Sequence, residues 1–574
     1  MTRQIVLDAE GLTIENVYNI VMNDYKLQLS NVMKKKILLA RRAIEKAVES
    51  NECIYGITTG FGALRDIVIP EEDAIELQLN LIRSHSVGVG EPLEDKYVKA
   101  MMVLRVAALA RGNSGCQLQT LENLVMMINR NALPIIPSKG SVGASGDLAP
   151  LSHMALAMIG EGKNNLKYNG KIYDANEGLK QAGIPLTELS YKEGLALNNG
   201  AQFSAGIACL VIADGTTILE TAELSAALSM EGLRGARQQF DERIHLSRNH
   251  PGQIISAKKI LEYTKGSKLV KIHRNIFHCQ MCGYYYDYEL GDETQKIPAG
   301  TKFEELQEDW HCPNCRANKH QFKEKKLKVQ DDYSLRCHPQ VIGPVRETLD
   351  FVKTIIQREI NAATDNPLIF IKNENPLEFD VYSGGNFHGE PIALAMDYLG
   401  IAMAEVGSIS ERRIAKLINS HRNEGLSSFL IHSKSLGLNN GYMMPQYTAA
   451  ALASENKGLA FPASVDSIPT SAEAEDHVSM SPIAARQVKA ILENLKYIIG
   501  IELLLAVQAI DLRCEIQKVK PEQVLGEKTL LVYRYIRNFI PKLTKDRILY
   551  PEIEQIAEMV QDGSILAAIK NDDQ

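Results

Sequence analysis

The sequence is poor in tryptophan, in net charge and in uninterrupted apolar runs. One tryptophan occurs in 574 residues, and the formal net charge is −7. A weakly acidic chain offers no strongly basic face, so we expect no nucleic-acid partner. No stretch of about 18 apolar residues is free of charge, and the longest candidate, residues 497–510, contains Glu502. We therefore expect no membrane span.

The N-terminal residues lack an apolar run behind a positive segment, so we expect no signal peptide and a cytoplasmic location. The chain is 45% hydrophobic and 23% charged, which is enough apolar material for a large core. Four of the nine cysteines fall in two Cys-x-x-Cys pairs. The other five are expected to be buried free thiols: Cys53, Cys116, Cys209, Cys337 and Cys514.

Helical periodicity dominates the chain and predicts a mainly α fold. It predicts helices over residues 31–50, 95–110, 118–128, 201–227 and 484–513. The segment 201–227 is nearly all apolar and rich in alanine and glycine, so we expect a buried helix that packs closely against its neighbours.

Residues 141–153, SVGASGDLAPLSH, form a small-residue loop that runs directly into a helical pattern. Within this loop, Ala144-Ser145-Gly146 has the residue types that a backbone cyclisation needs. The amide nitrogen of Gly146 must reach the carbonyl of Ala144, and glycine permits so tight a turn. The hydroxyl of Ser145 can leave as water. A helix that begins just after the loop would point its positive end at the resulting ring.

This loop resembles the prosthetic-group loop of the histidine, phenylalanine and tyrosine ammonia-lyases. In that family Ala-Ser-Gly cyclises to methylideneimidazolone, an electrophile. The resemblance therefore implies the same group built from Ala144, Ser145 and Gly146. It also implies a long-helix bundle and a homotetramer whose sites draw on several subunits.

Two earlier segments also resemble motifs of this family. Tyr55 opens YGITTGFG, a glycine-rich loop, and the resemblance implies that Tyr55 is a catalytic base. That role requires a phenol pKa below its usual value of about 10. His85 lies in NLIRSHSVGVGEPL, which resembles the substrate-selectivity segment and looks most like the histidine enzymes. A polar substrate ring needs such a hydrogen-bonding partner in a dry pocket.

Three later segments complete the resemblance around the prosthetic group. Asn199, in EGLALNNGAQ, matches an active-site asparagine, although Asn198 beside it leaves open which side chain points inward. Phe387, in GGNFHGEP, matches the phenylalanine that packs beside the prosthetic ring. Glu475, in EDHVSM, matches the glutamate that binds imidazole in the histidine enzymes. Ala474 departs from the family, which usually has glutamine there.

A cysteine-rich segment interrupts this pattern. Cys279 and Cys282 form one Cys-x-x-Cys knuckle, and Cys312 and Cys315 form a second. Four thiolates are enough for a closed tetrahedral metal site. The segment strongly resembles rubredoxin, which implies iron, although zinc is possible because thiolates suit both metals. A redox-active disulfide without metal is a third possibility. Arg316 departs from rubredoxins, which usually have glycine there.

The ammonia-lyase pattern resumes at residues 330–337, QDDYSLRC. Arg336 is predicted to hold the substrate carboxylate, since a guanidinium matches two oxygens. Gln330 and Tyr333 match family residues at the reacting end of the substrate. We therefore predict a lyase body at 1–272, an inserted rubredoxin-like, β-rich metal domain at 273–324, and the lyase body again at 325–574.

Together the motifs imply redox-neutral elimination of ammonia from an aromatic L-amino acid, most similar to the conversion of L-histidine to trans-urocanate. A tyrosine ammonia-lyase or a 2,3-aminomutase using the same prosthetic group is the first alternative. Elimination needs no electrons, so it does not explain the rubredoxin-like domain. A redox-sensing or electron-transfer function with a redox partner is therefore a separate alternative.

Overall fold

The structure is a computed structural model of the chain and describes residues 3–49, 54–270, 276–288, 290–325, 330–432 and 435–570. The chain divides into two compact units. The first unit comprises Met1–Ala213, Asp350–Gly400 and Ala460–Lys489, and the second comprises Asp214–Leu349, Ile401–Leu459 and Ala490–Gln574. This division does not separate residues 273–324 from the second unit, so the predicted inserted domain stays a prediction. Its predicted first residue, 273, lies outside the described residues.

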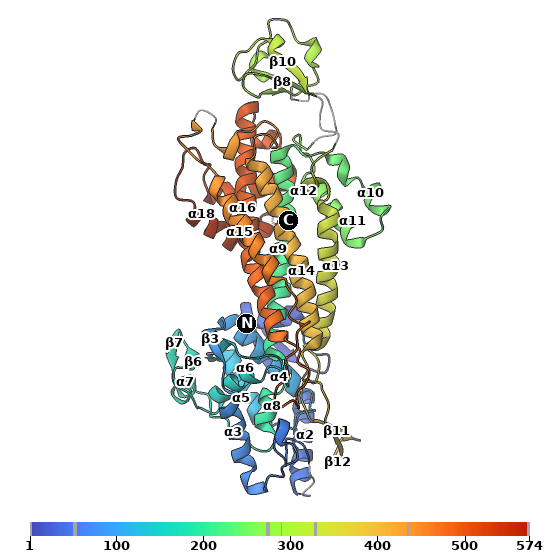
Figure 1. Cartoon of the computed structure of the whole chain (residues 1–574), viewed down its shortest axis with the longest axis vertical. Helices are drawn as coiled ribbons and strands as arrows, with labels where there is room; N and C mark the ends of the chain where they lie inside the picture. The colour runs from blue at the N-terminus through green and yellow to red at the C-terminus, as the bar shows by residue number, and fades with distance from the viewer. Residues whose placement is uncertain are drawn as a thin grey trace. The chain divides into compact units, whose positions relative to one another are not determined.

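The first unit is mainly helical, with small sheets between its helices (Figure 1). Its shorter helices are α1 (Ile14–Met22), α2 (Asn31–Glu49), α3 (Ala74–His85), α4 (Asp95–Ala110), α5 (Leu118–Arg130), α6 (Leu148–Met158), α7 (Ala175–Gln181) and α8 (Glu193–Asn198). Its strands are β1 (Gln4–Leu7), β2 (Lys26–Leu29), β3 (Val89–Pro92), β4 (Leu133–Pro134), β5 (Pro137–Lys139), β6 (Leu166–Tyr168), β7 (Lys171–Tyr173), β11 (Leu368–Lys372) and β12 (Asn375–Tyr382).

Strand pairing in the first unit is local. β1 and β2 pair in parallel, whereas β3–β5, β4–β6, β6–β7 and β11–β12 are antiparallel. The β11–β12 hairpin packs on α2, because Ala43 and Ile44 of α2 share a buried apolar cluster with Ile369 of β11.

Four long helices contribute residues to both units: α9 (Gln202–Leu233), α13 (His338–Glu359), α14 (Glu390–Ile418) and α16 (Ser481–Gln517). The five helices predicted from periodicity are confirmed as α2, α4, α5, α9 and α16, with small differences at their ends. The predicted close packing of α9 is also found. A Cβ atom added to Gly206 would lie 2.7 Å from the backbone nitrogen of Met101 in α4, so glycine is needed at this contact.

Two helices, α9 and α14, are long and apolar enough to cross a membrane by length and composition alone. Of the apolar window of α9, 78% is buried in the fold, and of that of α14, 61%. Buried core helices pass the same test, so these two helices are weak evidence for a span.

The second unit contains the cysteine-rich segment and the C-terminal helices. Its remaining helices are α10 (Glu242–Leu246), α11 (Pro251–Tyr263), α12 (Tyr333–Arg336), α15 (Met443–Leu459), α17 (Glu527–Phe539), α18 (Tyr550–Gln561) and α19 (Ser564–Lys570). The strands β8 (Ile276–Cys279), β9 (Tyr285–Tyr286) and β10 (Phe322–Lys325) form an antiparallel sheet in the order β10-β8-β9. Figure 1 shows β8 beside β10. The segment thus contains three short strands, and its assignment as a rubredoxin-like domain stays a prediction.

The scattered cysteines largely follow the prediction. Cys116, Cys209 and Cys514 are buried free thiols, whereas Cys337 is half-buried. Cys53 lies outside the described residues.

Candidate functional site

The loop that carries Ala144-Ser145-Gly146 makes a tight turn with two successive positive φ values. Ser145 and Gly146 have φ values of 50° and 81°, and the N–H of Gly146 donates to the carbonyl of Gly143 over 3.3 Å. A Cβ atom on Gly146 would lie 2.4 Å from the carbonyl oxygen of Gly200. Helix α6 begins at Leu148, directly after the loop. The residues therefore fit a methylideneimidazolone group formed in place.

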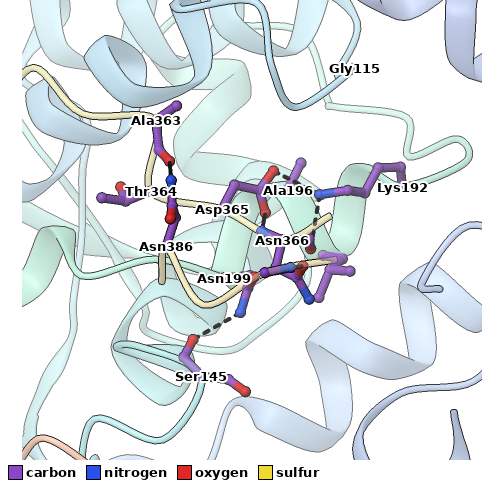
Figure 2. Close-up of polar contacts among 12 residues, drawn as sticks. Gly115, Ser145, Lys192, Ala196, Asn199, Ala363, Thr364, Asp365, Asn366 and Asn386 are labelled. Atoms are coloured by element: carbon purple, nitrogen blue, oxygen red, sulfur yellow. Dashed lines mark hydrogen bonds and ion pairs between the residues drawn. The ribbon is translucent and has the colours of Figure 1, made fainter. Parts of the chain in front are cut away.

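Asn199, rather than Asn198, faces this loop. Its Nδ2 donates to the carbonyl oxygen of Ser145 over 2.9 Å, as Figure 2 shows. Its Oδ1 is buried and has no hydrogen-bond partner among the described residues. Asn198 instead donates to the hydroxyl of Ser152 over 3.1 Å. The geometry thus settles which asparagine points toward Ser145.

Six of the eleven residues predicted for the lyase site line two cavities of the first unit. A cavity of about 650 Å³ is lined by Tyr55, His85, Ser145, Asn199 and Glu475, among others. A second cavity, of about 380 Å³, shares four of these residues and adds Phe387. Side chains from widely separated motifs therefore surround the same serine.

Glu475 connects the last predicted motif to the prosthetic loop. Its carboxylate accepts a short hydrogen bond from the hydroxyl of Ser145. Its other oxygen accepts from Oγ1 of Thr470 over 2.8 Å. Glu475 therefore has a fixed orientation at the cavity wall, with one oxygen at the serine that would lose its hydroxyl.

The pKa of the Tyr55 hydroxyl shifts in the direction opposite to the one that a base requires. Burial raises the pKa of Tyr55 above its usual value, and the nearby Glu475 carboxylate raises it further. The N–H of Gly62 donates to the Tyr55 hydroxyl over 3.3 Å and opposes this shift. The single chain thus does not supply the lowered pKa that a base role requires, because desolvation of the phenolate prevails. The role of Tyr55 as a base stays a prediction.

His85 is the last residue of α3, and its ring is half-buried. Burial lowers the pKa of His85 below its usual value, so the ring is neutral at pH 7. The hydroxyl of Ser84 lies 3.0 Å from its Nδ1. A neutral imidazole can donate and accept hydrogen bonds, which suits a polar ring in the cavity.

A buried ion pair, which was not predicted from the sequence, supports the site. Nζ of Lys192 lies 2.7 Å from Oδ2 of Asp365, and both side chains are almost completely buried (Figure 2). Lys192 also donates to the carbonyl of Asn366 over 3.3 Å. Oδ1 of Asn366 accepts from the N–H of Gly384 over 2.7 Å, three residues before Phe387. The pair thus anchors the segment that lines the second cavity.

Arg105 of α4 is a second buried support. Its guanidinium donates to the carbonyls of Ala196 (3.0 Å) and Asn199 (2.9 Å) and to Oε1 of Gln202 (2.6 Å). It therefore fixes the backbone that carries Asn199. The available sequence signal was a charged residue within a strongly apolar helix, where burial without partners would be very unfavourable.

A histidine-containing cluster also lies beside the predicted motifs. Single ligand atoms of His388, Glu390 and His477 lie within 4.8 Å of one another, and the two imidazoles approach to 3.5 Å. These residue types can bind a divalent metal. The three residues belong to two motifs already described, GGNFHGEP and EDHVSM, but their proximity could not be read from the sequence.

In the second unit, the four predicted metal ligands lie together. The sulfur atoms of Cys279, Cys282, Cys312 and Cys315 are all within 4.8 Å of one another. Sγ of Cys279 is 3.7 Å from Sγ of Cys315, and Sγ of Cys282 is 3.5 Å from Sγ of Cys312. A tetrahedral ion with metal–sulfur bonds of about 2.3 Å separates its ligands by about 3.8 Å. The donor set therefore fits a four-thiolate metal.

The two knuckles have matching backbones. The N–H of Gly283 donates to the carbonyl of Cys279 over 3.1 Å, and the N–H of Arg316 donates to the carbonyl of Cys312 over 2.8 Å. Their φ values are 80° and 62°. Arg316 thus adopts a left-handed conformation that glycine usually adopts, and its N–H makes the same bond in the second knuckle that Gly283 makes in the first.

The remaining predicted site residues belong to the second unit. Gln330 is exposed, Tyr333 is 71% exposed and Arg336 is half-buried. The guanidinium of Arg336 lies 4.8 Å from the centre of the Tyr333 ring. The described residues that line the two cavities of the first unit do not include these three. The two cavities therefore give no support to the role predicted for these three residues, which stays a prediction.

Comparison with known proteins agrees with this geometry. Residues 12–538 match the family described as aromatic amino acid lyase. The histidine ammonia-lyase of Caldanaerobacter subterraneus subsp. tengcongensis is 42% identical over 570 residues, which cover 99% of each chain. Among solved structures, histidine ammonia-lyase from Trypanosoma cruzi is 35% identical with a TM-score of 0.81, over 99% of this chain and 95% of that one. Tyrosine aminomutase from Streptomyces globisporus is 33% identical with a TM-score of 0.84, over 99% and 98%. The chain therefore belongs to the aromatic amino acid lyase family and is a carbon–nitrogen lyase.

Proposed function

We propose that the protein is a histidine ammonia-lyase that converts L-histidine to trans-urocanate and ammonia. The observation that carries this proposal is the cavity in which Tyr55, His85 and Glu475 surround Ser145. A neutral imidazole and a carboxylate at one cavity suit the two nitrogens of a histidine side chain. The similarity to histidine ammonia-lyases along nearly the whole chain supports the same substrate.

Each residue of the site has a separate role in the proposed reaction. Methylideneimidazolone, formed from Ala144-Ser145-Gly146, supplies an electrophile that makes the substrate amino group a better leaving group. Tyr55 takes a proton from the β-carbon, and Asn199 orients the loop through the carbonyl of Ser145. Glu475 and His85 bind the imidazole. Phe387 excludes water from one side of the cavity.

We further propose that a second copy of the chain completes the site. Arg336 would hold the substrate carboxylate, and Gln330 and Tyr333 would contact its reacting end. The 71% exposure of Tyr333 leaves it accessible to another subunit. A homotetramer would supply these residues from a neighbouring subunit, and mixing an Arg336→Met chain with a Ser145→Ala chain would test it. Recovery of activity in the mixed oligomer is expected, and its absence would contradict a shared site.

The substrate is tested by incubating purified protein with histidine, tyrosine and phenylalanine and quantifying arylacrylate, ammonia and β-amino acid. Urocanate and ammonia in equal amounts from histidine are expected. The likeness to tyrosine aminomutase makes a tyrosine lyase or 2,3-aminomutase the second candidate. Turnover of tyrosine, or a β-amino acid product, would favour that candidate instead.

We also propose that residues 273–324 form a rubredoxin-like domain with iron on Cys279, Cys282, Cys312 and Cys315, and that zinc is the alternative metal. The support is the sulfur arrangement and an aromatic core that includes Tyr286, Phe303 and Trp310. Metal analysis of the purified chain is expected to give one ion per chain. Loss of that ion in Cys279→Ser is expected, and an unchanged metal content would contradict the assignment.

If the ion is iron, the domain could exchange electrons with a redox partner in the cytoplasm, where free thiols persist. The exposure of Cys315 supports access to the metal from solvent. Turnover measured with oxidised and with reduced iron tests whether the domain senses redox state. Equal rates would remove the sensing role.

A further inference from the structure

The cysteine-rich segment makes a contact with the end of α9 that neither elimination chemistry nor metal binding requires. The guanidinium of Arg234 lies over the ring of Tyr285, 3.6 Å from its centre. Tyr285 follows the first knuckle almost directly, in β9, and is only 3% exposed. A cation over an aromatic face is strongest where water is excluded.

Arg234 occupies an unusual backbone position for this contact. At the end of α9, the N–H of Arg234 donates to the carbonyl of Glu231 (3.2 Å), and the N–H of Gly235 donates to the carbonyl of Met230 (2.8 Å). This is the Schellman arrangement, whose first residue beyond the helix cap is usually glycine. Here that residue is Arg234, with a φ of 52°. The chain therefore tolerates an unfavourable conformation at a residue whose side chain lies over the ring of Tyr285.

The same turn holds the segment that carries Arg336. The N–H of Ala236 donates to Oδ2 of Asp331 over 2.6 Å, at a site where Asp331 is 3% exposed. The backbone carbonyl of Asp331 accepts from Nε of Arg336 over 3.1 Å. Continuous contacts thus connect Tyr285, beside the metal knuckle, to the guanidinium of Arg336.

From these contacts we infer that the metal-loaded cysteine-rich domain positions Arg336 for substrate binding. With the four thiolates on a metal, the knuckle holds Tyr285 against Arg234, and the turn after α9 then holds Asp331 and Arg336. Arg234 and Asp331 are positioning residues, because they act only through Arg336. The inference rests on the proposed metal site and on the proposed role of Arg336, and it links metal occupancy to the affinity for the amino acid.

The test compares Tyr285→Leu, which removes the ring, with Tyr285→Phe, which keeps it. In Tyr285→Leu, KM for the amino acid should rise about 2- to 30-fold, the range expected for loss of a cation–π contact, while kcat and metal content stay unchanged. Hydrogen exchange of residues 330–336, measured without substrate, should become faster by a similar factor. Tyr285→Phe should restore both values, because the phenyl ring still faces Arg234.

Removing the metal supplies the second arm of the test. Chelation should raise KM and speed exchange at residues 330–336 in the wild type, but should add nothing further in Tyr285→Leu. Lys518→Met is the matched control. Lys518 donates to the carbonyl of Pro313, so it also contacts the cysteine-rich domain, but away from Tyr285 and Arg234. Its KM and exchange rates should match the wild type.

Unchanged exchange at residues 330–336 in both Tyr285→Leu and the metal-free protein would overturn the inference. An equal effect of Lys518→Met would also overturn it, because any weakening of domain docking would then suffice. A failure of the proposed function is distinguishable from these outcomes. It would appear as absent turnover in the wild type, whereas the exchange measurements need no substrate.

Discussion

The buried pair Lys192–Asp365 gives the sharpest test of how the site is supported. The two side chains are 0% and 1% exposed, and their charged atoms are 2.7 Å apart. Removing one partner leaves the other charge buried and unpaired, which destabilises the local structure by about 3–5 kcal/mol. Lys192→Met is therefore expected to increase local opening around Asn366 by roughly two to four orders of magnitude.

A double variant tests whether the loss of stability comes from an unpaired buried charge. Lys192→Met combined with Asp365→Leu removes both charges, and a buried ion pair replaced by apolar residues is often close to neutral. Its effect should therefore be far smaller than the sum of the single effects. The exposed pair Lys35–Glu374, whose side chains are 60% and 74% exposed, is the matched control, and Lys35→Met should change stability by less than about 1 kcal/mol.

Native-state hydrogen exchange of the peptides that contain Asp365 and Phe387 measures the opening directly. Turnover should fall in each single variant, because Asn366 holds Gly384 and the segment that lines the second cavity. Single effects that add within about 0.5 kcal/mol in the double variant would refute the reasoning. So would a Lys35→Met effect as large as that of Lys192→Met.

Three other changes test individual groups. Glu475→Gln should lower kcat/KM for histidine about 10- to 100-fold, since a hydrogen bond to a charged group contributes about 1.5–3 kcal/mol. Phenylalanine turnover and the two-water mass loss at residues 144–146 should not change, and an equal loss on both substrates would contradict a selectivity role. Because burial raises the pKa of Tyr55, kcat/KM should keep rising into the alkaline range, and a plateau at neutral pH would show that assembly lowers this pKa. Burial also raises the pKa of Asp147 to about 7, from about 3.9 in an unfolded chain. The folded state then binds more protons than the unfolded state between these values, so the free energy of unfolding should fall as pH rises from about 4 to about 7. Asp147→Asn should reduce that slope in denaturant titrations at several pH values, and an unchanged slope would contradict the assignment.

The sequence was most informative where a residue type is dictated by backbone geometry or by local periodicity. The long helices were predicted because their apolar spacing is regular. Gly146 was singled out because a backbone cyclisation needs a tight turn that glycine permits, and the structure gives it a positive φ and a close approach to Gly200. The four cysteines were predicted to meet because two Cys-x-x-Cys knuckles supply the four thiolates of a tetrahedral metal site. Arg316 could be noticed as a departure, but its positive φ could not be known from the sequence.

The supports of the site were not predictable, because they depend on long-range contacts. Lys192 and Asp365 are 173 residues apart, and neither stands out in sequence as a buried charge. The sequence could not show in which direction the pKa of Tyr55 shifts, because that direction depends on how much water the folded cavity excludes. Which asparagine faces Ser145 also required coordinates, since adjacent residues differ only in the direction of their side chains.

The contacts of the prosthetic loop also set the time at which the protein can mature. Residues 142–147 bond to Gly200 and to Met480, through the N–H of Asp147 and the carbonyl of Val142, and the hydroxyl of Ser145 bonds to Glu475. Glu475 lies 330 residues after Ser145 and is therefore synthesised long after the loop itself. A nascent chain that ends before residue 475 therefore lacks the surroundings that bend the loop. Ring formation would then report that the distant segments have come together, and incomplete chains would remain chemically unreactive.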